Sequence, residues 1–134
     1  MQTTETISHN HMTDRLSEFH ALVARLRREY PNETLAFMNF MKKASEGPAL
    51  STKFKELINV ALGVSAQCEW CIAFHVQQAA SAGATREEVM EAGFMAVLMH
   101  GGPALAHLKP LMDSIDEFLP KEQVGDKSNQ KSIV

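Results

Sequence analysis

Cysteine is scarce in this chain of 134 residues, which has two, Cys68 and Cys71. Two cysteines cannot form the several disulfides of a small secreted scaffold, and a chain of this length can bury a core without them. Long apolar runs are also missing, since none approaches the roughly 18 residues of a membrane-spanning helix. Residues 1–12 lack the basic and apolar regions of a signal peptide. We therefore expect a single domain in a reducing cytoplasm, with no membrane partner.

An excess of positive charge is absent as well. The 16 acidic residues outnumber the 13 lysines and arginines, and the formal net charge is -3. A protein without an overall positive field is not drawn to nucleic acid, so we expect no nucleic-acid partner. The local cluster of Arg25, Arg27 and Arg28 has acidic neighbours and is typical of a solvated helix face.

Helical periodicity is what the sequence does have. Apolar residues recur at three- and four-residue spacing along most of the chain, and no segment alternates convincingly as a strand does. We predict an all-α, single-domain fold of about six helices over residues 13–120, between flexible segments at 1–12 and 121–134. With their caps, the predicted helices cover about 14–29, 32–41, 51–62, 67–82, 85–100 and 103–119.

Several helix ends carry specific signals. Pro31 is expected to end the first helix, and the residue after it, Asn32, to cap the second. Ser51 is expected to cap the third helix, and a left-handed glycine at position 83 suits the stop after the fourth. Thr85 and Glu88 have the spacing of a capping box, in which each side chain satisfies a backbone amide of the other residue.

The two cysteines form the motif Cys68-Glu69-Trp70-Cys71, and His75 follows four residues later. At 100° per residue, Cys68, Cys71 and His75 fall on one helix face, so both thiols and the imidazole stack over about two turns. The helix dipole favours a thiolate at the first cysteine. Helical neighbours at i,i+3 have β-carbons about 5–6 Å apart, whereas a relaxed disulfide needs about 3.5–4.5 Å. We therefore expect a strained, readily reduced disulfide that suits turnover.

The motif leaves three interpretations open: a thiol redox site, a zinc site, or two buried cysteines beside a satisfied core histidine. Zinc would need a fourth ligand, for which Glu56, His100 and His107 are candidates, and this chain lacks the second CxxC that structural zinc sites usually have. A thioredoxin-like site needs a βαβ context that the sequence does not offer. By periodicity alone, Glu56 is a solvated carboxylate on the polar side of its helix.

The wider pattern is more specific than the CxxC. Eleven residues separate Glu56 from the segment Cys68-x-x-Cys71-x-x-x-His75, and Gly83-Ala84-Thr85 and Glu87-Glu88 follow. Over about residues 50–110, this pattern resembles the carboxymuconolactone decarboxylase / AhpD-like alkylhydroperoxidase family. The resemblance implies an all-helical AhpD-like fold that assembles into trimers or hexamers.

Periodicity gives a second reason to expect a homo-oligomer. The helix of the CxxC is apolar nearly all round, with Trp70 and Phe74 on the face away from the cysteines. Such a helix is usually central, or covered by another subunit.

The resemblance also implies peroxidase chemistry without a cofactor or a metal. By the family pattern, Cys71 attacks the peroxide, Cys68 resolves the product to a disulfide, and Glu56 and His75 form a proton relay. The implied partners are a hydroperoxide substrate and a reductant, either a dithiol protein or a small thiol. The family's peroxidases often carry a histidine just before the second cysteine, where this chain has Trp70. A decarboxylase of the lactone type and a non-enzymatic redox-sensing oligomer are the alternatives.

Overall fold

The computed structural model describes residues 11–120, and that part of the chain is helical without a strand. Its helices are α1 (His11–Glu29), α2 (Pro31–Ser45), α3 (Thr52–Ser65), α4 (Glu69–Ser81), α5 (Arg86–His100), α6 (Gly102–Ala106) and α7 (Leu108–Phe118). The all-α prediction is confirmed. No helix within these residues combines the length and the apolar character needed to cross a membrane.

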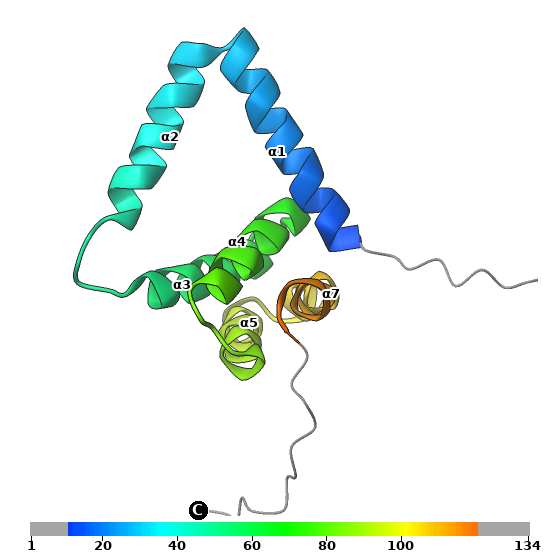
Figure 1. The fold of residues 1–134 in the computed structure, drawn as a ribbon. Coiled ribbons are helices and arrows are strands. Elements are labelled where there is room, and N and C mark those ends of the chain that lie inside the picture. Colours follow the sequence, from blue (N-terminus) through cyan, green and yellow to red (C-terminus); the bar gives the residue numbers. More distant parts are fainter. Residues whose placement is uncertain (1–10, 121–134) are drawn as a thin grey trace, which may run out of the picture.

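Helix α4 lies at the centre of the packing. It contacts α3 on one side and α7 and α1 on others, and its residues Ile72, Ala73 and Val76 are fully buried. Helix α5 closes the cluster by packing on α3 and α7. Figure 1 shows α3, α4, α5 and α7 grouped together. Helix α1 starts beside this group and meets α2 at a tip away from it. The expectation that an all-round apolar helix is central is confirmed for α4.

Most predicted helix ends are confirmed. The Ser51 side chain accepts a hydrogen bond from the amide of Phe54, and Gly83 has a φ of 88° directly after the cap of α4. The capping box is present, because the Glu88 carboxylate accepts from the Thr85 amide at 3.0 Å and the Thr85 hydroxyl accepts from the Glu88 amide at 3.2 Å. These bonds fix the start of α5.

The predicted cap of the second helix is wrong. Asn32 lies inside α2, which begins at Pro31, and the preceding Tyr30 contributes no side-chain cap among the described contacts. Proline is favoured at a first helical position because its fixed φ suits the helix and its missing N–H would have no partner there. Pro31 therefore starts the second helix.

Other boundaries also differ from the predictions, since α2 and α3 run on to Ser45 and Ser65. Helix α1 begins at His11, so the expected flexible segment 1–12 is two residues too long, and Met12 is buried. The rest of that segment and residues 121–134 lie outside the described residues. The predicted sixth helix is interrupted at His107, which separates α6 from α7. Pro110 explains the break, since it has no N–H to continue the helical ladder one turn back.

Candidate functional site

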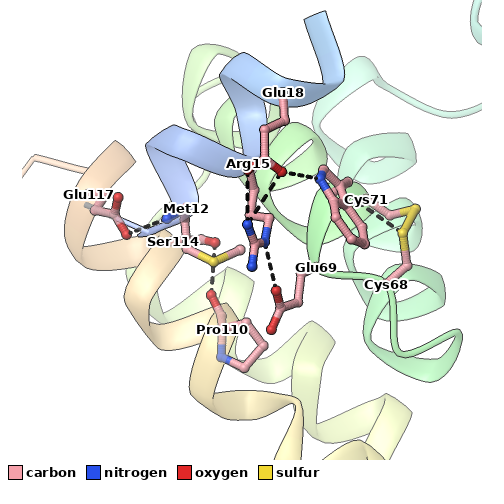
Figure 2. Close-up of polar contacts among 10 residues, drawn as sticks. Met12, Arg15, Glu18, Cys68, Glu69, Cys71, Pro110, Ser114 and Glu117 are labelled. Carbon is pink, nitrogen blue, oxygen red and sulfur yellow. Dashed lines mark hydrogen bonds and ion pairs between the residues drawn. A yellow bond between two sulfur atoms is a disulfide. The ribbon is translucent and has the colours of Figure 1, made fainter. Parts of the chain in front are cut away.

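The two cysteines lie at the start of α4, directly after the turn that connects it to α3. Cys68 is the N-cap of α4 in an extended backbone conformation (φ -114°, ψ 101°), and its Sγ accepts a hydrogen bond from the Cys71 amide at 3.1 Å. A disulfide joins the two residues, and their Cα atoms are 5.2 Å apart. Figure 2 shows this disulfide at the start of the helix. That Cα separation lies within the range that disulfides span.

The helical prediction for Cys68 is therefore wrong. Helix α4 begins at Glu69, one residue later, so the two cysteines are not helical i,i+3 neighbours. The i,i+3 spacing from which a strained disulfide was expected is therefore absent. An N-cap residue leaves the helical conformation, which frees Cys68 to approach the first turn.

A compact turn sets the position of Cys68. The amide of Cys68 donates to the Gly63 carbonyl at 3.2 Å, and the amide of Gln67 donates to the Val64 carbonyl at 3.1 Å. Gln67 has a φ of 55°, the left-handed conformation in which glycine is common. These two bonds and this φ make a Schellman motif at the end of α3. Cys68 thus ends the motif of one helix and caps the next.

His75 is paired with a carboxylate from the neighbouring helix. Its Nδ1 lies 2.8 Å from Oε2 of Glu56 on α3, and the two side chains are only 21% and 14% exposed. The Phe74 ring packs edge-on against the imidazole, with centroids 5.0 Å apart. The periodicity argument that made Glu56 a solvated carboxylate is wrong. The helical i,i+4 relation puts His75 one turn after Cys71 on α4.

This pair has a defined chemical capacity. In the tautomer whose Nδ1–H donates to Glu56, the Nε2 atom of His75 holds a lone pair that can accept a proton. The carboxylate then orients the ring and stabilises the imidazolium that forms. The four residues that the sequence pattern picks out thus form two contacting pairs, Cys68–Cys71 and Glu56–His75, on α3, α4 and the turn between them.

The residues between the cysteines are held by α1, which the sequence did not indicate. Arg15 Nε donates to Oε2 of Glu69 at 2.9 Å, and Glu18 accepts from the Trp70 indole N–H at 2.8 Å. The Arg15 guanidinium also lies 5.2 Å from the Trp70 ring centroid, and it donates to Glu18 at 3.1 Å. The hydrogen bond to Glu69, followed by the charge of Glu18, raises the pKa of Arg15 above its ordinary value. Figure 2 shows Arg15 between Glu18 and Glu69.

The zinc alternative finds no ligand set in residues 11–120. That part of the chain contains no group of three or more His, Cys, Asp or Glu side chains placed to hold a metal ion. His107 uses Nδ1 on the Pro103 carbonyl at 2.9 Å, and His100 is exposed at the end of α5. Neither histidine supplies the fourth ligand that zinc would need beside the cysteines.

Comparison with known proteins gives a consistent picture. Residues 31–113 match the model of the carboxymuconolactone decarboxylase family. The uncharacterized protein 4 of the cox locus of Paracoccus denitrificans is 40% identical over 83 residues, which are 62% of this chain and 75% of that protein. An uncharacterized protein of Cupriavidus necator is 34% identical over 102 residues, covering 76% of this chain and 90% of the relative.

Two solved structures share the fold. A carboxymuconolactone decarboxylase family protein of Legionella pneumophila superposes with a TM-score of 0.77 at 36% identity, over 80% of this chain and 96% of that one. A family protein of Thermotoga maritima, for which a part in the antioxidative response has been suggested, gives a TM-score of 0.69 at 25% identity. That match covers 78% of this chain and 88% of the other.

Proposed function

This chain belongs to the carboxymuconolactone decarboxylase family, and on that premise we propose that it is a CxxC-dependent thiol oxidoreductase that reduces hydroperoxides. One observation carries the proposal: the Cys68–Cys71 pair begins the same helix on which His75, paired with Glu56 at 2.8 Å, lies one turn later. Thiol redox catalysis needs a thiol that can become a thiolate, a base that takes its proton, and a second thiol, and a dithiol near a carboxylate-oriented imidazole supplies all three. The antioxidative role suggested for the Thermotoga relative points the same way.

The reaction we propose has three steps: oxidation of Cys71, formation of the disulfide, and reduction of the disulfide by an external thiol. His75 takes the proton of Cys71, and the thiolate attacks the terminal oxygen of the hydroperoxide. The O–O bond breaks, the alkoxide takes a proton to leave as an alcohol, and Cys71 becomes a sulfenic acid. The Cys68 thiol then displaces water from that sulfur to form the disulfide. A dithiol protein or small thiol reduces the disulfide and is itself oxidised.

Cys71 suits the attacking role and Cys68 the resolving one. Cys71 is the third residue of α4 and lies one turn from His75, which can take its proton, whereas the helix dipole alone would favour a thiolate at Cys68. Cys68 is held in an extended cap with its sulfur beside the Cys71 amide. The proton relay would be Glu56 and His75, and no cofactor or metal is needed for these steps.

We further propose that copies of the chain assemble as a trimer or hexamer. None of the residues of α2, all of which the structure describes, is buried, and its Phe37 and Phe40 are 61% and 67% exposed. A second apolar surface is a groove of about 760 Å³ between α3 and α5, which includes Phe54, Ile58 and Met95. Apolar patches of this kind mark interaction sites.

Phe74 does not need a second subunit to cover it, contrary to the expectation from the sequence. Phe74 is already packed within the chain, with its ring 5.3 Å from that of Phe19 on α1, whereas Trp70 remains 44% exposed. The case for assembly therefore depends on α2 and the α3–α5 groove. Sedimentation at micromolar concentration tests it, and a stable monomer would reject it.

Steady-state consumption of a hydroperoxide with a dithiol reductant tests the proposed activity. The wild-type protein is expected to turn over many times, and Cys71→Ser to be inactive at equal protein concentration. A single turnover followed by a stable disulfide would favour the redox-sensing oligomer instead. If the thiols of the wild-type protein do not react with peroxide, the proposal is contradicted and a decarboxylase is the remaining candidate.

A further inference from the structure

Both residues between the cysteines are tied to one short stretch of α1. Glu69 is bound by Arg15, Trp70 is bound by Glu18, and Arg15 and Glu18 are bound to each other. The guanidinium also faces the Trp70 ring at 5.2 Å, a distance at which a cation is attracted to an aromatic face. We call these four residues the α1 clamp. It is formed by residues 52–54 positions apart in the sequence.

The side of the clamp that belongs to α1 has a fixed base. The Glu117 carboxylate on α7 accepts from the backbone amides of Met12 and Thr13 at 3.2 and 2.9 Å, and from the Thr13 hydroxyl at 3.0 Å. A carboxylate at these free amides stabilises a helix start. Met12 and Leu16 are buried in the core on the same turns. Figure 2 shows Glu117 and Met12 to the left of Arg15.

The other side of the clamp is the first turn of α4, which directly follows Cys68. Cys68 lies outside α4 in an extended cap, and Glu69 and Trp70 are the first two residues of the helix. First turns of helices fray, because their amides have no partner within the helix. In the oxidised protein the disulfide holds this segment. After reduction, fraying would carry the Cys68 sulfur away from Cys71.

We propose that Arg15 and Glu18 are positioning residues of the redox pair, which hold Glu69 and Trp70 so that Cys68 stays within reach of Cys71 in the reduced protein. The inference depends on the proposed thiol chemistry for its role in a reaction. The step concerned is attack of the Cys68 thiol on the Cys71 sulfenic acid, which forms the S–S bond and releases water. Holding two reacting groups together raises their effective concentration, so the clamp speeds this step and favours the disulfide.

The α1 half of the clamp lies outside the part of the chain that matches the family model. Residues 31–113 match, whereas Arg15 and Glu18 are on α1, which ends at Glu29. The two α1 residues of the clamp are therefore not among those that the family model matches.

The decisive measurement is the equilibrium between the thiols and the disulfide in a glutathione buffer, read by thiol alkylation and intact mass. It needs no hydroperoxide, so it can fail or succeed separately from the proposed peroxidase activity. Arg15→Met should lower the equilibrium constant for disulfide formation about threefold to tenfold, the combined size of a surface ion pair and a cation–π contact. Arg25→Met is the matched control, since Arg25 Nε binds Glu29 at the same 2.9 Å on the same helix. It should leave the constant unchanged.

Two more variants separate positioning from general stability. Arg15→Lys keeps the charge and should recover part of the loss, and Trp70→Phe should lower the constant because it removes the donor to Glu18. A purely structural role would destabilise the oxidised and reduced proteins equally, which lowers Tm and leaves the glutathione equilibrium as in wild type. Equal constants for Arg15→Met, Arg25→Met and wild type would overturn the proposal. After peroxide, Arg15→Met should also give several-fold more dimedone-trapped sulfenic acid than Arg25→Met.

Discussion

Nδ1 of His75 lies 2.8 Å from the carboxylate of Glu56, a contact that joins α4 to α3 one turn beyond Cys71. Both side chains are mostly buried, so the pair is shielded from solvent on most of its surface. A carboxylate on one ring nitrogen fixes the orientation of an imidazole and leaves the other nitrogen for proton transfer. The same contact also joins the two helices whose connecting turn carries Cys68.

Glu56→Gln should slow the reaction of Cys71 with hydroperoxide by about 10- to 100-fold, because the amide orients His75 but does not stabilise its cation. The rate is measured under single-turnover conditions with pre-reduced protein. Glu91→Gln is the control, since Glu91 is an exposed carboxylate on α5. If Glu56→Gln and Glu91→Gln react equally fast, the relay has no part in activating the thiol.

The two cysteines should give different products with stoichiometric peroxide. Cys68→Ser should accumulate a sulfenic acid on Cys71 that dimedone captures, because the resolving thiol is gone. Cys71→Ser should not react, and wild type should lose the mass of about two protons as the disulfide forms. Intact-mass spectrometry distinguishes these outcomes. Dimedone capture at Cys68 in the Cys71→Ser variant would mean that the two roles are reversed.

The sequence predicted those parts of the fold that depend on local signals. Each of these signals involves residues within three positions of one another, so it can be identified from the local sequence. They are the caps at Ser51 and Thr85 and the stop at Gly83. The same local rules misplaced Asn32, because proline both disfavours helix before it and starts one well. They also extended α4 backward over Cys68, whose cap geometry depends on the turn after α3.

The site was predictable only where a family pattern supplied the long-range information. Periodicity placed Glu56 in solvent, and it took the resemblance to link that residue to His75, 19 positions away. No family pattern pointed to Arg15 and Glu18. Their contacts with Glu69 and Trp70 depend on how α1 packs against α4. Contacts between helices far apart in sequence follow from packing, which the amphipathic pattern of one helix does not specify.

The capping box should make part of the stability depend on pH. Hydrogen bonds from the Thr85 amide and then Lys53 lower the pKa of Glu88 below its usual value of 4.5. A carboxyl whose folded pKa is depressed stabilises the fold above its unfolded pKa, and this contribution is lost as the pH falls through the folded pKa. Glu88→Gln keeps an acceptor for the cap but carries no charge. Its Tm should therefore lie below that of wild type at pH 7 and approach it below pH 4.5, whereas Glu87→Gln should track wild type throughout.

The turn before the redox motif offers the last prediction. Gln67 has a φ of 55°. A residue with a side chain is strained by about 1–2 kcal/mol in that conformation, whereas glycine is not. Glycine loses more backbone entropy on folding, so Gln67→Gly should stabilise the protein by a net of about 0.5–1 kcal/mol. Gln78→Gly, within α4, is the matched control and should destabilise by about 1 kcal/mol. Urea unfolding of the oxidised proteins measures both differences. If Gln67→Gly destabilises as much as Gln78→Gly, the Gln67 side chain makes a compensating contribution, and the left-handed turn before Cys68 is not a source of strain.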